Sequence, residues 1–158
     1  MAERSIKIDA PVETVFAYVS DISRHSEWAQ HELKLEQTSS GAVQVGATFH
    51  SVGHQMGREF ESEVKITEFV PNEKLAFESE GKDFHFQHHF LMQSDNGGTR
   101  LTKGGEPRRV GFPFNIAIPV LGLLGVINRG LDRDLAAIKA NIEGGGPAPA
   151  AEEAQAAE

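Results

Sequence analysis

VGFPFNIAIPVLGLLGVINRGLDRDLAAIKANIE, residues 110–143, is the stretch that decides the fold. From Val120 onward its apolar residues recur at the spacing of one face of an α-helix, and charged residues occupy the other faces. The apolar positions are Val120, Leu124, Ile127, Leu131, Leu135, Ile138 and Ile142. A long helix with one apolar face must bury that face, and strand-like segments precede it. The sequence therefore predicts that this helix lies on a sheet.

The first half of this stretch, residues 110–128, carries no charge and approaches the length of a membrane-spanning helix, about 20 residues. It is interrupted by Pro113, Pro119 and several glycines, and its apolar spacing continues into a charged amphipathic helix. We therefore expect a core or lid element and no stable membrane insertion. Transient contact with a membrane surface remains an open alternative.

Composition is typical of one globular domain followed by a tail. The chain has 158 residues, no cysteine and a formal net charge of −8, which argues against nucleic acid as a partner. Its first residues lack the basic-then-apolar pattern of a signal peptide, so we expect a cytoplasmic protein. The Gly-Gly-Gly-Pro run at 144–147 ends the helix, and we predict a domain over residues 1–143 and a disordered Gly/Pro/Ala/Glu-rich tail over 144–158.

The order of elements predicts an α+β fold. Pro11 is well placed to begin a helix, and a second short helix is expected to end near Trp28. The later segments alternate between apolar and polar residues, as half-buried strands do. Strands are expected near residues 4–8, 32–38, 47–54, 58–70, 75–80, 84–93 and 100–105. With no helix between the later strands, they are expected to form an antiparallel meander.

Two motifs carry a family resemblance: IKIDAPVETVF at residues 6–16, followed by Asp21 and Trp28, and ITEFVPNEKL at residues 66–75. With them, the chain resembles the START-like (SRPBCC) superfamily over about residues 1–143. It is most similar to the polyketide cyclase/dehydrase and lipid-transport type. The resemblance implies a helix-grip fold, in which a curved, seven-stranded antiparallel sheet wraps around the long C-terminal helix and two short helices follow the first strand.

The same resemblance implies a cavity between sheet and helix for an apolar small molecule. Phenylalanines dominate the aromatic residues, ten against one Trp and one Tyr, and many fall on the apolar sides of their strands. Plain core packing is the alternative for each of them. The expected ligand-binding residues are Trp28, Phe49, Phe60, Ser62, Phe77, Ser79, Phe86, His88, Phe90, Phe112 and Phe114. We expect the ligand to enter between Trp28 and the segment 112–119.

His88 is the candidate catalytic residue. It falls between Phe86 and Phe90 in the alternation, so its imidazole is expected on an apolar face. There it would orient a ligand or transfer a proton, because the ordinary pKa of histidine is about 6.5. A core histidine bonded to the backbone is the alternative.

No metal or cofactor is expected. Of the seven histidines, His50 and His54 lie about 13 Å apart along one strand face, and His88 faces away from His85 and His89. Nucleophile-elbow, phosphate-loop and dinucleotide-binding motifs are absent from the sequence.

Two function classes remain after these exclusions. The first is a carrier or sensor that binds a hydrophobic small molecule, such as a lipid, a quinone or a polyketide-like compound. The second is a polyketide cyclase, aromatase or dehydratase that uses the same cavity. Few polar residues share the apolar strand faces, so the pattern favours binding. The oligomeric state is not indicated by the sequence.

Overall fold

The computed structural model describes residues 2–29, 32–55, 57–111 and 123–144 of the chain. Its elements in chain order are β1 (Ala2–Ile8), α1 (Val12–Ser20), the 3-10 helix η1 (Ile22–Glu27), β2 (Glu32–Gln37), β3 (Thr48–Gln55), β4 (Arg58–Val70), β5 (Lys74–Gly81), β6 (Phe84–Asp95), β7 (Gly98–Val110) and α3 (Leu123–Glu143). The second of the predicted early helices is therefore a 3-10 helix, and it ends just before Trp28 as expected.

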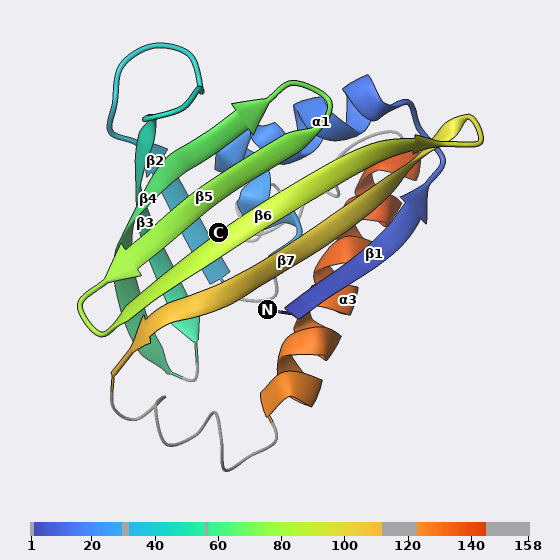
Figure 1. Ribbon diagram of the computed structural model, residues 1–158. Coiled ribbons are helices and arrows are strands. Elements are labelled where there is room, and N and C mark those ends of the chain that lie inside the picture. Colours follow the sequence, from blue (N-terminus) through green and yellow to red (C-terminus); the bar gives the residue numbers. More distant parts are fainter. Residues whose placement is uncertain (1, 30–31, 56, 112–122, 145–158) are drawn as a thin grey trace, which may run out of the picture.

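The strands form one antiparallel sheet in the order β1-β7-β6-β5-β4-β3-β2. From β2 to β7 the chain is a meander, and β1 returns to pair with β7, so the first and last strands are neighbours. Figure 1 shows a curved sheet in front, with α1 and α3 on the face of the sheet that points away from the viewer. The predicted helix-grip fold of class α+β is confirmed.

The apolar face of α3 packs as its spacing predicts. Leu131, Leu135 and Ile138 are buried, and α3 contacts β1, β7 and α1. Leu135 and Ile138 belong to a core cluster that includes Ile8 of β1 and Leu101 of β7. This is the layer arrangement expected when a helix covers one face of a sheet.

Tyr18 joins three elements at the end of α3. Its hydroxyl donates a hydrogen bond of 2.9 Å to Glu27 Oε2, and it accepts one of 2.9 Å from Asn141 Nδ2. Burial raises the pKa of Tyr18 to about 12, so the hydroxyl keeps its proton and remains a donor. This network fastens the C-terminal end of α3 to α1 and η1.

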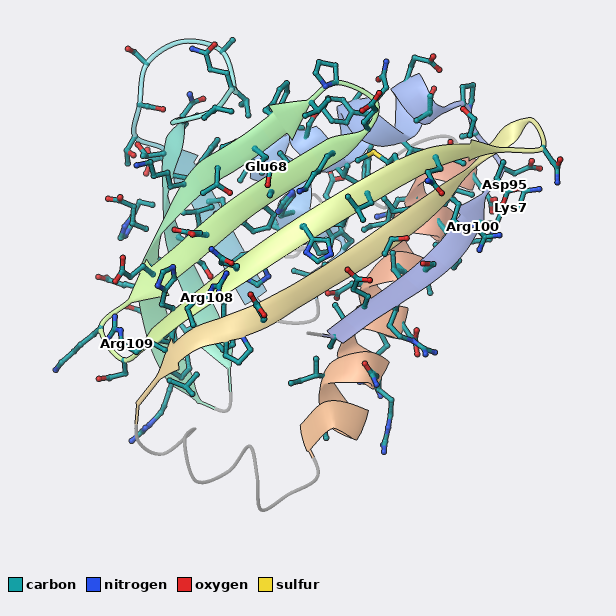
Figure 2. All side chains as sticks on the ribbon, in the orientation of Figure 1. Lys7, Glu68, Asp95, Arg100, Arg108 and Arg109 are labelled. Carbon is teal, nitrogen blue, oxygen red and sulfur yellow. The ribbon has the colours of Figure 1, made fainter. Side chains whose placement is uncertain are left out.

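The outer face of the sheet carries the charges. Labelled examples in Figure 2 are Glu68, Arg100 and Arg108, and Arg100 pairs with Asp95 at 3.0 Å across the last hairpin. That hairpin turns at Asn96 and Gly97, whose φ angles of 47° and 83° are the left-handed values of a tight hairpin turn. The Asn-Gly pair is typical of such a turn, because both residues adopt positive φ angles readily.

The last strand is longer than the predicted 100–105. β7 runs from Gly98 to Val110 because it pairs with β6 along its whole length, and Val110 lies opposite Phe84. Pro107 interrupts the apolar-polar alternation of the sequence and cannot donate a ladder hydrogen bond. The β6–β7 register shifts between His85 and Phe86, next to Pro107, which lies opposite Phe86.

A second irregularity reverses the side-chain alternation in β4. The β4–β5 register shifts between Ile66 and Glu68, which leaves both Thr67 and Glu68 exposed. After this bulge Phe69 points inward and packs edge-to-face on Phe16 of α1, with ring centroids 5.2 Å apart. The bulge thus turns the end of β4 onto the helical layer.

Candidate functional site

A row of aromatic rings lines the inner face of the sheet, which faces the helices. Side chains alternate along a strand, so the even-numbered residues of β6 share this face. Cross-strand pairing places Phe77 opposite His88, and their rings stack with centroids 4.9 Å apart and planes at 24°. The inner aromatic row, as we call it, runs in order through Phe60, Phe84, Phe86, His88, Phe77, His25, Phe90 and Trp28.

Burial changes along this row. Phe90 is 0% exposed and Trp28 5%, so one end of the row is core. At the other end Phe60, Phe84 and Phe86 are only partly buried. β7 leaves the sheet beside this end, because Val110 pairs with Phe84 and the amide of Gly111 donates to Asp83 O. The row therefore passes from the core to a partly accessible apolar surface.

His88 sits in the middle of the row and faces inward as predicted. Its Nε2 lies 3.1 Å from Ser79 Oγ, within hydrogen-bond distance, and its ring is flanked by Phe77 and Phe86. Burial lowers the pKa of His88 to about 3, and the positive charge of Lys103 acts in the same direction. At neutral pH the imidazole is therefore uncharged and is one donor and one acceptor.

His25 is a second inward-facing histidine, which the sequence analysis did not single out. It lies in η1, where its Nε2 donates a 2.9 Å hydrogen bond to Val19 O and its ring packs on Trp28. Burial lowers the pKa of His25 to about 4 despite this hydrogen bond, so it is also uncharged at neutral pH. His25 matches the alternative weighed for His88, a core histidine satisfied by the backbone.

A buried ion pair lies between the sheet and α3. Lys103 Nζ of β7 is 2.7 Å from Asp134 Oδ2, and their side chains are 10% and 13% exposed. The same Nζ lies 5.2 Å from the ring centroid of Trp28 and 6.0 Å from that of Phe90. Lys103 thus brings a positive charge to the core end of the aromatic row.

Residues 2–143 match the family described as "Polyketide cyclase / dehydrase and lipid transport". The chain belongs to this family. The match confirms the predicted resemblance over nearly the whole folded region. No curated protein matches the chain.

Solved structures similar to this family member share its fold at low sequence identity. TTHA0849 from Thermus thermophilus has a TM-score of 0.73 at 17% identity, over 90% of this chain and 97% of that one. The di-domain ARO/CYC StfQ from the steffimycin biosynthetic pathway gives 0.69 at 15%, over 90% of this chain and 50% of that one. Ara h 8.0201 gives 0.65 at 10%, over 90% and 97%. At these identities the likeness shows the fold alone.

The predicted site residues fall into three groups. The row contains Trp28, Phe60, Phe77, Phe86, His88 and Phe90, with Ser79 bonded to His88. Phe49 is buried in the core opposite Val64, and Ser62 is partly buried opposite Ser51. Phe112 and Phe114 lie outside the described residues, as does most of the predicted lid. Their roles, and the cavity between sheet and helix, stay predictions.

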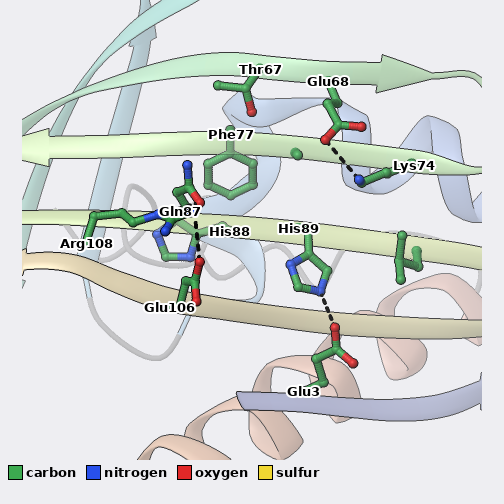
Figure 3. A pocket seen from close by; sticks show the side chains of 12 residues that line it. Glu3, Thr67, Glu68, Lys74, Phe77, Gln87, His88, His89, Glu106 and Arg108 are labelled. Carbon is green, nitrogen blue, oxygen red and sulfur yellow. Dashed lines mark hydrogen bonds and ion pairs between the residues drawn. The ribbon is translucent and has the colours of Figure 1, made fainter. Parts of the chain in front are cut away.

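On the opposite face of the sheet the surface is hollowed into a depression of about 330 Å³ (Figure 3). Ala76 and Leu91 contribute apolar surface to it. Its ionisable side chains pair with one another, and the distances are 2.8 Å for His89–Glu3, 2.9 Å for Lys74–Glu68 and 3.0 Å for Arg108–Glu106. Charges satisfied in this way make a weaker candidate site than the inner aromatic row.

Two further expectations from the sequence concern metal binding and membrane insertion. In the described part of the chain, no group of three or more His, Cys, Asp or Glu side chains is placed to hold a metal ion. None of the described helices has the length and apolar character needed to cross a membrane.

Like His25, Lys103 and Asp134 are residues beside the row that were not predicted from the sequence. A signal existed for Lys103, because it alternates with Leu101 and therefore shares its inward face. Asp134 stands next to Leu135 on the edge of the apolar stripe of α3. What the sequence did not indicate is that these two residues, 31 positions apart, meet.

Proposed function

We propose that this protein binds a hydrophobic small molecule, such as a lipid, quinone or polyketide-like compound, on the inner face of its sheet. It would act as a carrier or sensor in the cytoplasm. The observation that carries the proposal is the burial gradient of the inner aromatic row. Phe60, Phe84 and Phe86 keep accessible surface although they continue a stack of core rings.

Partly buried aromatic rings next to a core are surfaces that a ligand can cover. Burial of apolar surface stabilises a complex by about 25 cal/mol per Å², and most small-molecule sites are apolar with a few polar groups. The Ser79–His88 pair is such a polar group in the middle of the row. An uncharged imidazole there costs little to cover and can orient a ligand oxygen.

Cyclase, aromatase or dehydratase activity is the second candidate. Family membership and the inward-facing His88 favour it, and StfQ, an ARO/CYC protein, shares the fold. The low pKa of His88 weakens it, because a general base works best when its pKa is near the working pH. We therefore assign His88 an orienting role and place binding first.

Native mass spectrometry of the purified protein tests the proposal most directly. We expect an added mass from a co-purifying apolar molecule, or binding of an added apolar probe such as naphthalene. Phe86→Ala should weaken binding of this molecule several-fold, because it removes a ring from the accessible end of the row. Phe69→Ala is the matched control, since it removes an inward-facing ring that packs on Phe16 beyond the β4 bulge.

The two candidate functions separate at His88. In the binding role, His88→Gln alters affinity modestly, and no turnover exists to lose. In the enzymatic role, the same variant abolishes turnover of a polyketide-like substrate while binding stays nearly intact. His50→Gln, on the exposed side of β3, should change neither property. If no apolar molecule binds to the wild-type protein, or if Phe86→Ala binds as the wild type does, the proposal is wrong.

A further inference from the structure

The Lys103–Asp134 ion pair has hydrogen-bonding capacity that the described protein groups leave unused. A lysine ammonium has three donors, and Lys103 gives one to Asp134 Oδ2 at 2.7 Å. Nζ also lies near the ring faces of Trp28 and Phe90, which accept no conventional hydrogen bond. On the partner side, Asp134 Oδ1 is buried and has no hydrogen-bond partner among the described residues.

A buried pair of this kind needs a physical reason. Removing two charges from water costs several kcal/mol per ion, and apolar residues of similar size are often as stable or more so. A buried carboxylate oxygen without a donor adds a further cost. Stability alone therefore does not account for the pair, whereas a ligand that completes its hydrogen bonds would.

The position of the pair connects it to the inner aromatic row. Lys103 lies opposite Phe90 in the β6–β7 ladder, and the next inward position of β7, Gly105, lies opposite His88. Lys103 and His88 are therefore diagonal neighbours on one face. Gly105 carries no side chain that would separate them.

The local charges exclude an anionic ligand. Lys103 and Asp134 cancel each other, and the nearest ionisable rings of the row, His25 and His88, are uncharged at neutral pH. A carboxylate placed here would leave one uncompensated negative charge in a buried site. A hydroxyl adds no charge, accepts a hydrogen bond from Nζ and donates one to Oδ1.

We infer that the Lys103–Asp134 pair is a specificity-determining site for an uncharged hydroxyl group, an alcohol or a phenol, on an otherwise apolar ligand. The inference rests on the proposed binding function, because it requires a ligand on the inner aromatic row to extend to the core end, where Lys103 lies against Trp28 and Phe90. Lys103 Nζ donates to the hydroxyl oxygen, and the hydroxyl hydrogen points to Asp134 Oδ1. The pair selects against hydrocarbons, which leave both groups unsatisfied, and against carboxylates.

Three probes of nearly equal shape test this inference: naphthalene, 2-naphthol and 2-naphthoate, titrated calorimetrically at neutral pH. Desolvation of the hydroxyl alone would make naphthol bind more weakly than naphthalene. We expect naphthol to bind about tenfold more tightly than naphthalene, because it gains hydrogen bonds to charged groups. Naphthoate should bind most weakly. The indole N–H resonance of Trp28, the only tryptophan, should shift on binding and report the location.

The variant that removes the pair is Lys103→Met/Asp134→Leu, which leaves no unpaired charge. It should keep its affinity for naphthalene and lose the preference for naphthol. The matched control is Arg4→Met/Asp132→Leu, which removes the exposed 2.7 Å ion pair between β1 and α3. This control should keep the preference.

The outcomes distinguish the two proposals. If none of the probes binds to the wild-type protein, the proposed function fails. If naphthalene binds but naphthol binds no more tightly, or if naphthoate binds more tightly than naphthol, only the present inference is wrong. The wild-type comparison holds even where the double variant does not fold. A folded double variant that still prefers naphthol also overturns the inference.

Discussion

His25 and His88 are uncharged imidazoles in the interior, while His50 stands exposed on β3. Whether a histidine is buried or exposed therefore depends on the face of the element on which it lies. For His88, alternation with Phe86 and Phe90 was enough to predict the inward direction. For His25 it was not, because a 3-10 helix has neither the spacing of a strand nor that of an α-helix.

These two histidines predict a loss of stability in mild acid. In the unfolded chain they titrate near 6.5, whereas burial holds their folded pKa values at about 4 and about 3. Between these values the unfolded state binds more protons, so the free energy of unfolding falls as the pH falls. From pH 7 to pH 5 each histidine should contribute a loss of roughly 2 kcal/mol.

Urea unfolding at these two pH values measures the effect. His88→Gln should lose about 2 kcal/mol less than the wild type between them, because one of the two buried imidazoles is gone. His50→Gln should follow the wild type. An identical pH dependence of all three proteins would show that His88 titrates normally in the folded state.

At the scale of elements, the sequence predicted the types well and the ends less well. Alternation placed β4 at Arg58–Val70 even though it reverses at the bulge after Ile66, and the stripe of α3 placed Leu131, Leu135 and Ile138 in the core. The extension of β7 beyond Gly105 was not predicted, because Pro107 and the two adjacent positive charges after it are typical of a loop. The segment is a strand because it pairs with β6, and this pairing cannot be inferred from the sequence of the segment itself.

The packing of α3 leads to a direct test. Leu135 is 1% exposed, and Leu135→Ala should destabilise the protein by roughly 2–5 kcal/mol through lost burial and a residual cavity. Val126→Ala, on the exposed side of the same helix, should change little. Chemical denaturation measures both. A negligible effect at Leu135 would mean that this face of α3 does not hold the helix to the sheet.

Two glycines should respond in opposite ways to alanine. A Cβ at Gly130 of α3 meets no atom within 4 Å, so Gly130→Ala should stabilise the helix by about 0.5–1 kcal/mol. A Cβ at Gly98 of β7 would lie 2.6 Å from Ile8 O, where the first and last strands meet. Gly98→Ala should therefore be destabilising. Thermal unfolding of both variants checks the signs, and a stabilised Gly98→Ala would contradict the close β1–β7 contact.

At the scale of the whole molecule, the sequence predicted the features that depend on local spacing, and it did not predict contacts between residues far apart in the chain. Alternation and helical spacing report which face a residue occupies, and that was enough for the fold and for most of the inner aromatic row. They do not report which residues meet across elements. The Lys103–Asp134 pair and the Tyr18–Asn141 hydrogen bond join positions 31 and 123 residues apart, and only the folded chain brings them together.

The predicted domain boundary at residue 143 leads to the last prediction. Beyond it, the sequence has only Gly, Pro, Ala, Glu and Gln, so residues 144–158 have little apolar surface to bury. α3 ends at Glu143, and the family match ends at the same residue. The carboxylate of Glu143 accepts a hydrogen bond from the Asp9 amide at 2.8 Å, which holds the last turn of the helix to the end of β1.

A chain that stops after Glu143 keeps this contact and every residue of the core cluster. Its melting temperature should therefore stay within about 2 °C of that of the full chain, as expected when no residue of the core cluster is lost. Calorimetry of the two proteins makes the comparison, and naphthalene binding should be equal in both. A much larger drop in melting temperature would show that the tail packs on the domain and that the boundary lies further along the chain.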